Sequence, residues 1–328
     1  MYVRVKRRDF IGLVGAATLA PFSAGAQQQV PVVGFLYAGS PEPNGKRVAA
    51  FRKGLGDTGY VEGRNVAIEF RWAEKEEQLL ELAADLVRQR VAVIATPVST
   101  QATLAAKAAA GTTPIVFAVG GDPVALRLVA SLNRPGGYIT GISILNVEVM
   151  PKRLGLLREL VPQATRFGVL VNPETVFTPA VVKSVQAGAQ ALGLLVEVFR
   201  ASTEAEIEAS FADISKRPGG ALLLGPDAFF TSRSALITAL AARHSIPTMY
   251  VIREFAAAGG LISYGPDIVN ICEQVGAYAG RILAGEKPAD LPVVQSAKFE
   301  MVINLKAAKA LGLSAPPTLL ATADEVIE

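Results

Sequence analysis

The sequence predicts an α/β protein with two Rossmann-like lobes, each built on a parallel sheet and joined to the other by a hinge. Apolar strand-like runs alternate with helical segments along the chain, which is the pattern of parallel sheets with helical crossovers. The 328 residues exceed what one hydrophobic core usually serves, so two domains are expected. Two stretches of the chain also repeat the same spacing of strands, which indicates two similar lobes in tandem.

The first series of elements begins near residue 30. A continuous apolar run at 32–37 is typical of a parallel strand that is covered on both faces. Apolar residues at helical spacing follow at 48–55, and residues 66–72 alternate between apolar and polar, as in a half-buried strand. The series is completed by strands at 91–95 and 115–119 and by helices around 79–87 and 99–110.

A second series of elements starts near Arg166. It predicts strands at 167–171, 194–199, 221–224 and 248–251, and helices at 178–192, at 232–244 and after a capping box formed by Thr203 and Glu206. In the first series, Pro114 follows Gly34 by 80 positions. In the second, Pro247 follows Gly168 by 79 positions. Each proline precedes a strand that follows a helix, so the two series have the same geometry.

The remaining residues predict a return to the first lobe rather than a third lobe. They hold a strand at 261–264, a long helix at 267–283, a strand at 299–303 and a short helix at 305–311. We therefore expect the first lobe to comprise residues 30–145 and about 262–292, and the second to comprise 146–261. The C-terminal segment, 293–328, is expected at the hinge.

The first 26 residues predict a cleaved export signal. The apolar run at 10–21 carries no charge and is shorter than the roughly 20 residues that span a bilayer. Basic residues precede it and a small-x-small pattern ends at Ala26, so we expect cleavage after Ala26 and a periplasmic mature protein. The arginine pair at 7–8, followed after one residue by two apolar ones, favours the twin-arginine route. A general secretory signal and an uncleaved anchor are the alternatives.

The charge of the mature chain argues against one class of partner. The whole chain has a formal net charge of +3, and the signal, with four basic residues and one acid, carries all of it. The mature protein is therefore near neutral, and no nucleic-acid partner is expected, because such binding needs a basic face. The single cysteine, Cys272, cannot form an internal disulfide and is expected to behave as a small buried apolar residue.

No catalytic, cofactor or metal motif is recognisable. The glycines of GLGDTG at 54–59 follow a helix and precede a strand, which inverts the context of a dinucleotide-binding loop, so Gly56 or Gly59 is expected to end that helix. The single histidine, His244, lies near a helix end, and one histidine with one cysteine cannot assemble a typical structural zinc site. The chain has no G-x-S-x-G and no P-loop. We therefore expect no enzyme activity, no cofactor and no metal.

The carboxyl ends of the predicted strands carry the candidate ligand-binding residues. Ligands bind outside these ends in open α/β sheets. Each residue there also fits an ordinary loop or helix cap, but the set, facing across two lobes of an exported protein, favours a ligand cleft. The candidates are Tyr37, Ser40, Ser99, Thr100, Asp122, Asn172, Asp227, Tyr250 and Tyr264.

These candidates have distinct expected roles. The tyrosine rings would cover an aromatic or apolar part of the ligand. Backbone N–H groups near Ser99 and at 172–174, where helices begin, would bind a carboxylate. Asp122 or Asp227 would meet an ammonium group, so the set fits an amino-acid-like molecule.

Several longer fragments carry a resemblance to a known family. They are GYVEGRNVAIEFRWAE from Gly59, LNRPGGYITGIS from Leu132, REFAAAGGLISYGPD from Arg253, GRILAGEKPADLPV from Gly280 and INLKAAKALGL from Ile303. With them, the chain from Val30 to Glu328 resembles the solute-binding proteins of ABC importers with the type I periplasmic binding fold, in the group that includes bacterial tryptophan-binding proteins. The resemblance implies two lobes, a hinge crossed three times and a small molecule held between the lobes.

The resemblance also implies a function. It predicts an extracytoplasmic solute-binding protein, acting as a monomer, that delivers a small molecule to an ABC permease in the inner membrane. A periplasmic ligand-sensing partner of a membrane receptor is the alternative. A Rossmann-type enzyme is disfavoured by the inverted glycine motif, and a transcription regulator with the same two lobes is disfavoured by export.

Overall fold

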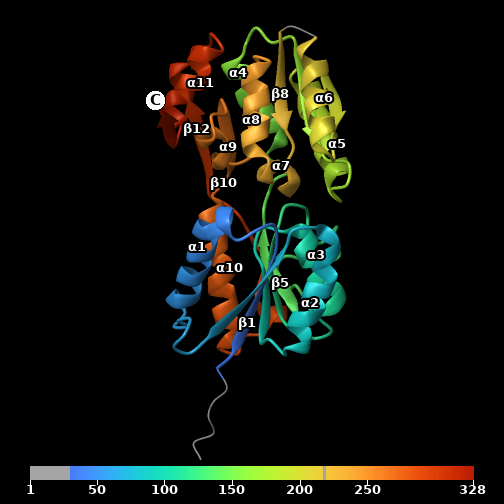
Figure 1. Ribbon diagram of the computed structural model, residues 1–328, viewed down its shortest axis with the longest axis vertical. Helices are drawn as coiled ribbons and strands as arrows, with labels where there is room; N and C mark the ends of the chain where they lie inside the picture. The colour runs from blue at the N-terminus through green and yellow to red at the C-terminus, as the bar shows by residue number, and fades with distance from the viewer. Residues whose placement is uncertain (1–29, 217–218) are drawn as a thin grey trace, which may run out of the picture. The chain divides into compact units, whose positions relative to one another are not determined.

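Two separate β-sheets organise the chain between Pro31 and Glu328 (Figure 1). The computed structural model describes residues 30–216 and 219–328. The predicted export signal, residues 1–26, lies outside the described residues. Each sheet, with its covering helices, forms one lobe, as the sequence predicts. Within the described residues, no helix is both long enough and apolar enough to cross a membrane.

The sheet of the first lobe has six strands in the order β11-β5-β4-β3-β1-β2, and every pairing in it is parallel. Its strands are β1 (Val32–Ala38), β2 (Ala67–Ala73), β3 (Val93–Thr96), β4 (Ile115–Val119), β5 (Ile139–Ser143) and β11 (Val294–Gln295). Its helices are α1 (Gly45–Asp57), α2 (Leu79–Arg88), α3 (Thr100–Ala109) and α10 (Ile268–Leu283). Phe35 packs with Phe51 of α1, whereas its neighbour Leu36 packs with Leu86 of α2, so α1 and α2 cover opposite faces of the sheet.

Two glycines let α1 and α10 touch backbone to backbone. A Cβ on Gly54 would lie 1.8 Å from the carbonyl oxygen of Glu273, and a Cβ on Gly276 would lie 2.1 Å from that of Phe51. Gly54 is the first glycine of the GLGDTG motif, so this residue serves helix packing. Gly59, the last one, has a φ of 90° just after α1 ends, as expected of a helix-terminating glycine.

The sheet of the second lobe has seven strands in the order β13-β12-β10-β9-β8-β6-β7. They are β6 (Arg166–Val171), β7 (Val196–Arg200), β8 (Gly220–Leu224), β9 (Thr248–Tyr250), β10 (Ile262–Pro266), β12 (Phe299–Asn304) and β13 (Glu325–Ile327). Only β10 and β12 pair antiparallel.

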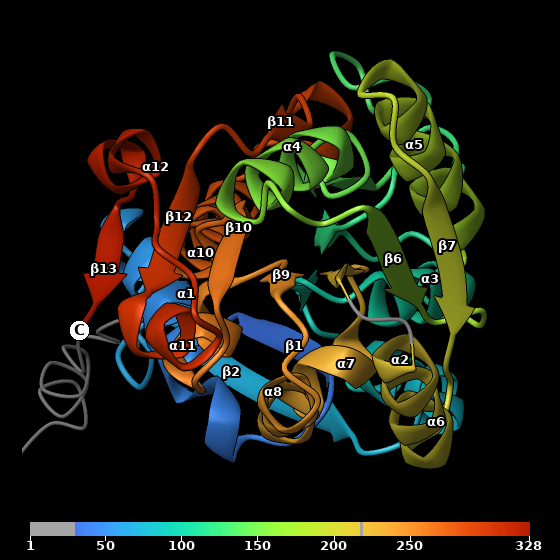
Figure 2. The same cartoon turned by 90° about the horizontal axis from the view of Figure 1, so that it is seen from above.

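Helices cover both faces of this second sheet. They are α4 (Met150–Leu160), α5 (Thr178–Ala191), α6 (Glu204–Ser215), α7 (Ala228–Ser232), α8 (Ser234–Arg243), α9 (Arg253–Ala257), α11 (Leu305–Ala310) and α12 (Pro317–Thr322). Figure 2 shows α4 and α5 on one face and α6 and α8 on the other. The expected capping box of Thr203 and Glu206 opens α6, and His244 is the C-cap of α8.

The lobe boundaries differ from those expected from sequence. The strand expected at 261–264 is β10, and it joins the second sheet because it pairs with β9 and β12. The return to the first lobe therefore begins with α10. The C-terminal segment also divides, since β11 extends the first sheet whereas β12 and β13 extend the second. The chain thus passes between the sheets after β5, after β10 and after β11.

Candidate ligand-binding site

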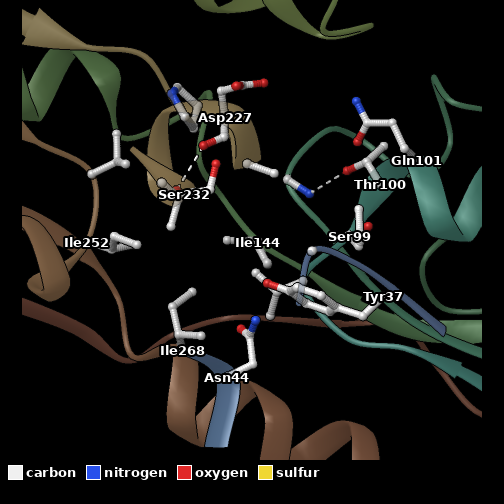
Figure 3. A pocket seen from close by; sticks show the side chains of 18 of the residues that line it. Tyr37, Asn44, Ser99, Thr100, Gln101, Ile144, Asp227, Ser232, Ile252 and Ile268 are labelled. Atoms are coloured by element: carbon white, nitrogen blue, oxygen red, sulfur yellow. Dashed lines mark hydrogen bonds between the residues drawn. The ribbon is translucent and has the colours of Figure 1, made fainter. Parts of the chain in front are cut away.

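A cavity of about 560 Å³ lies at the carboxyl ends of the parallel strands and is lined by both lobes (Figure 3). From the first lobe it receives residues at or after the carboxyl ends of β1 to β5, Asn44 just before α1, Arg47 of α1 and Ile268 of α10. From the second lobe it receives residues that follow β6, β8 and β9. The size suits a small organic molecule, since ligand pockets usually measure roughly 300–1,000 Å³.

Five of the nine predicted ligand-binding residues line this cavity. They are Tyr37, Ser40, Ser99, Thr100 and Asp227. All five follow the carboxyl end of a parallel strand or stand at it, which is why sequence could place them. The other four, Asp122, Asn172, Tyr250 and Tyr264, do not line it.

Asp122 and Asn172, two of the predicted ligand-binding residues, make hydrogen bonds within the protein instead. Asp122 is exposed, and its Oδ1 accepts a hydrogen bond from the backbone N–H of Val124, so it closes a local turn after β4. Asn172 is buried behind the cavity, where its Nδ2 donates to Asp227 Oδ1 at 3.3 Å. Asn172 therefore supports a lining residue without lining the cavity itself.

The two predicted tyrosines outside the cavity, Tyr250 and Tyr264, pack against neighbours in the second lobe. Tyr250 is fully buried, and its ring stacks on Phe255 with 4.9 Å between the ring centroids. Tyr264 stacks on Phe299, and its hydroxyl accepts a hydrogen bond from Lys152 Nζ at 2.7 Å. In both cases the strand register directs the ring to a neighbouring element and away from the cavity.

Asp227 presents its carboxylate at the start of α7. Its Oδ1 accepts from the backbone N–H of Phe230 at 3.2 Å, which makes it the N-cap of that helix. Its Oδ2 accepts from the hydroxyl of Thr175 at 2.5 Å. Across the cleft, burial and then the negative charge of Asp227 raise the pKa of Glu76, which belongs to the first lobe. Acidic groups of the two lobes thus face each other on this side of the cavity.

The first turn of α3 forms another wall. Val98 lines the cavity with a φ of 54°, a left-handed conformation that is strained for a β-branched residue and costs on the order of 1–3 kcal/mol. Ser99 follows as the N-cap, and its hydroxyl accepts from the N–H of Ala102. Thr100 Oγ1 accepts from the backbone N–H of Gly120, another lining residue. The backbone N–H groups at this helix start favour an anionic group.

Sequence reasoning missed Arg47 and Glu254. Arg47 lies on α1 and is buried; its guanidinium donates to the Tyr37 hydroxyl and, at 3.2 Å, to Glu254 Oε1 of α9. Burial opposes the charge of Arg47, but Tyr37 and Glu254 outweigh it and raise the pKa of Arg47. Since α1 and α9 belong to different lobes, this ion pair joins the lobes at the cavity. The available signal was that Arg47 stands four residues before Phe51, on the apolar face of its helix.

Sequence reasoning also missed Asn146 and Arg153. Asn146 lines the cavity where the chain leaves β5, and its Oδ1 accepts from Arg153 Nη2 at 3.3 Å. Arg153 is fully buried on α4, and burial lowers the pKa of its guanidinium to about 9. The signal was again positional, because Arg153 follows Met150 by three residues and so falls within the apolar stripe of that helix.

The remaining lining gives the cavity an apolar region. Tyr37 and Phe177 contribute aromatic rings. Ile144, Ile252 and Ile268 contribute aliphatic surface (Figure 3). Among the described residues, no group of three or more His, Cys, Asp or Glu side chains could hold a metal ion. The arrangement fits a molecule with an apolar body and charged groups at one end.

Comparisons with known proteins agree with this geometry. The family model of the ABC transporter substrate binding protein matches residues 42–327. A tyrosine-binding protein of Clostridioides difficile (strain R20291) is 28% identical over 270 residues, which cover 82% of this chain and 77% of that protein.

Solved structures show the same two-lobed fold. An ABC domain from Streptococcus pneumonia in complex with L-Trp has a TM-score of 0.83 at 25% identity, over 90% of this chain and 99% of that one. The open, ligand-free structure of a substrate binding protein with adhesive properties from Clostridium difficile has a TM-score of 0.69 at 25% identity, over 91% and 99% of the two chains. The predicted resemblance and fold are therefore confirmed.

The family match covers most of the chain, and its members bind their substrates without transforming them, as the lack of catalytic motifs predicted. The chain belongs to the ABC transporter substrate binding protein family.

Proposed function

We propose that this protein binds an aromatic L-amino acid, tyrosine or tryptophan, between its lobes and delivers it to an ABC importer. The observation that carries the proposal is a cavity that combines aromatic and aliphatic walls with charged groups of both signs. The relatives that bind tyrosine and L-Trp support the same class of solute.

The carboxylate, the ammonium group and the aromatic side chain of such a solute each have complementary residues in the cavity. The carboxylate is placed at the N–H groups that open α3, beside Ser99 and Thr100. The ammonium group is placed at Asp227, on the acidic side of the cavity. The aromatic side chain lies against Phe177 and the isoleucines, where burial of apolar surface contributes roughly 25 cal/mol per Å².

Binding to both lobes at once is what couples the solute to closure. A ligand shifts a conformational equilibrium only through its different affinities for the two states. Carboxylate contacts in the first lobe and ammonium contacts in the second are simultaneous only when the lobes are close. The higher TM-score to the L-Trp complex than to the open structure, at the same identity, supports a closed arrangement here.

Calorimetric titration of the mature protein tests the proposal. We expect L-tyrosine or L-tryptophan to bind, and D-allose, a solute of an unrelated chemical class, not to bind. At about 100 times its dissociation constant, the cognate amino acid should stabilise the fold by about 2.7 kcal/mol. Binding of a sugar but of no aromatic amino acid would overturn the proposal.

Export and transport form the outer part of the proposal. We infer that the protein is exported by the twin-arginine route, is cleaved after Ala26 and acts in the periplasm as a monomer with an inner-membrane permease. Conversion of Arg7 and Arg8 to lysine should leave uncleaved precursor in the cytoplasm, as seen by cell fractionation. Normal export of that double variant would contradict the twin-arginine assignment.

A further inference from the structure

We propose that the side-chain amide of Asn146 binds the carboxylate of the solute, and that Arg153 is the positioning residue that aims this amide into the cavity. The inference rests on the proposed function and adds the residue that distinguishes an acid from its neutral analogues. It follows from the orientation of Asn146, from the charge of Arg153 and from the place of both on the crossing between the lobes.

The hydrogen bond to Arg153 fixes which end of the Asn146 amide faces the cavity. A guanidinium has only donors, so the amide must turn its one acceptor, Oδ1, toward Arg153. The Nδ2 end then lies on the other side, and a Cβ built on Gly120 would be only 3.1 Å from it. Gly120 and Asn146 both line the cavity. Within the described residues, Asn146 Nδ2 makes no hydrogen bond, so its two donors are left for a ligand.

The charge of Arg153 makes an anionic partner favourable. Its guanidinium is fully buried and donates to the carbonyl oxygens of Tyr264, Asn146 and Val251, at 2.7, 3.3 and 3.3 Å, as well as to Asn146 Oδ1. All of these acceptors are neutral, and no carboxylate of the described residues pairs with it. A buried charge without a counter-ion is unfavourable. A solute carboxylate on Asn146 Nδ2 would lie one amide group away from that charge.

Other donors converge on the same corner. Gly120, next to Asn146 Nδ2, donates its backbone N–H to Thr100 Oγ1 at 3.3 Å, so the first turn of α3 adjoins the Asn146 amide. A carboxylate placed here can accept from Asn146 and from the helix start together. Its two oxygens have about four acceptor sites, which suits such a set of donors.

The position of the pair on the hinge adds a geometric role. Asn146 follows β5, Tyr264 lies on β10, and Arg153 belongs to α4 of the second lobe. Arg153 therefore ties together two of the segments on which the chain passes between the lobes. The amide keeps its direction because a fully buried side chain that contacts both segments holds it.

Asn146→Asp is the decisive variant. It preserves size, replaces the Nδ2 donors by an anionic oxygen and gives Arg153 an acidic partner. We expect the ligand-free variant to melt at the same or a higher temperature than the natural protein. We expect its affinity for L-tyrosine or L-tryptophan, measured by calorimetry, to fall about 100-fold, since a donor is lost and two carboxylates face each other.

The ratio of affinities for L-tyrosine and L-tyrosinamide reports the carboxylate contact directly. The natural protein should prefer the acid, and Asn146→Asp should lose or reverse that preference. Asn44→Asp is the matched control, because it adds the same charge to another lining asparagine, whose Nδ2 donates to the Ser40 carbonyl. That control should keep the preference for the acid. Arg153→Lys keeps the charge but lacks the planar guanidinium that orients the amide. It should bring the affinities for L-tyrosine and L-tyrosinamide closer together.

The outcomes separate the two proposals. A natural protein that binds neither L-tyrosine nor L-tryptophan overturns the proposed function and this inference together. A natural protein that binds them, with an acid-to-amide ratio unchanged by Asn146→Asp, overturns this inference alone. Arg153→Lys that does not fold leaves Asn146→Asp to decide.

Discussion

Arg47 and Arg153 are both buried arginines beside the same cavity, but the structure compensates their charges in opposite ways. Arg47 has an acidic partner, Glu254, together with the Tyr37 hydroxyl, and these neighbours raise the pKa of its guanidinium. Within the part of the chain that the structure describes, Arg153 has only neutral acceptors, and burial lowers the pKa of its guanidinium to about 9. The Arg47 pair joins the lobes, whereas we infer that the charge of Arg153 supports the proposed carboxylate contact of Asn146.

The surroundings of the two arginines explain why each arrangement holds. The Glu254 side chain is 46% exposed, so the pair with Arg47 can separate into water when the lobes move apart. Arg153 is enclosed by α4, β10 and the segment after β5, so it has no such route to solvent. Arg47 therefore suits a contact that forms and breaks as the lobes move, whereas Arg153 suits a contact that stays in place.

The largest effect is expected from replacing Arg153, which should lower the free energy of unfolding. Arg153→Met leaves the carbonyl oxygens of Asn146, Val251 and Tyr264 without their donor, although it also removes an unfavourable buried charge. The net loss in the free energy of unfolding should be about 2–4 kcal/mol, measured by urea titration. Arg158→Met, on the exposed side of the same helix, should change it by less than about 1 kcal/mol. Equal stability of the two variants would show that the buried hydrogen bonds of Arg153 do not stabilise the fold.

The acidic side of the cavity gives the next effect. Asp227→Asn removes the carboxylate proposed to meet the ammonium group, so affinity for L-tyrosine should fall at least about 10-fold, or roughly 1.4 kcal/mol. Asp122→Asn makes the same chemical change outside the cavity and should leave affinity as it is. Calorimetry on both variants checks this, and a larger loss for Asp122→Asn would place the site elsewhere.

Glu254→Gln tests whether Arg47 holds the lobes together. It breaks the ion pair between the lobes, so small-angle scattering of the ligand-free protein should show a larger radius of gyration. Unfolding stability should change by only about 1 kcal/mol, because one partner is half exposed. Glu286→Gln breaks a pair with Arg281 inside the first lobe and should leave the radius unchanged. A radius that stays the same in both variants would mean that Arg47 does not hold the lobes together.

The smallest effect concerns the carboxyl group of Glu300 on β12. Burial disfavours its charged form, as it does for Arg153. Burial, followed by the charge of Asp267, raises the pKa of Glu300 on β12 to about 7, despite the nearby Arg253; Glu254 and Asp324 add to the rise. The folded state therefore holds a proton that the unfolded state has lost between pH 4.5 and about 7, and stability falls as pH rises through that window.

Glu300→Gln should accordingly raise the melting temperature at pH 8 and have little effect at pH 5. Glu208→Gln, at an exposed position on α6, serves as the control and should show no such dependence. Thermal melts of both variants at the two pH values measure this. A stabilisation by Glu300→Gln that is equal at both pH values would show that Glu300 does not titrate in this way.

The sequence was sufficient for most of the fold because its periodicities are local. Alternation of buried strands with capped helices predicted both lobes, and the Thr203 capping box and the end of α1 near Gly59 lie where expected. The assignment of β10 failed, because its sheet depends on pairing with β12, more than thirty residues further along the chain. No local pattern reports such a pairing.

The site residues also fall into those that local sequence patterns predict and those that depend on long-range structure. Tyr37, Ser99 and Asp227 could be predicted because parallel strands end at the same edge of a sheet. The orientation of Tyr250 depends on strand register. Arg47 was accessible only as a cation within an apolar helical stripe, and the same holds for Arg153.

A crystal structure of the protein with L-tyrosine would show how both lobes hold the amino acid. We expect the amino acid to lie between the lobes, with its carboxylate within hydrogen-bonding distance of Asn146 Nδ2 and its ammonium group at Asp227. Its ring should lie against Phe177 and the isoleucines of the cavity. An amino acid that contacts one lobe alone would overturn the proposed binding between the lobes, and an ammonium group facing Asn146 would overturn the proposed role of Asn146.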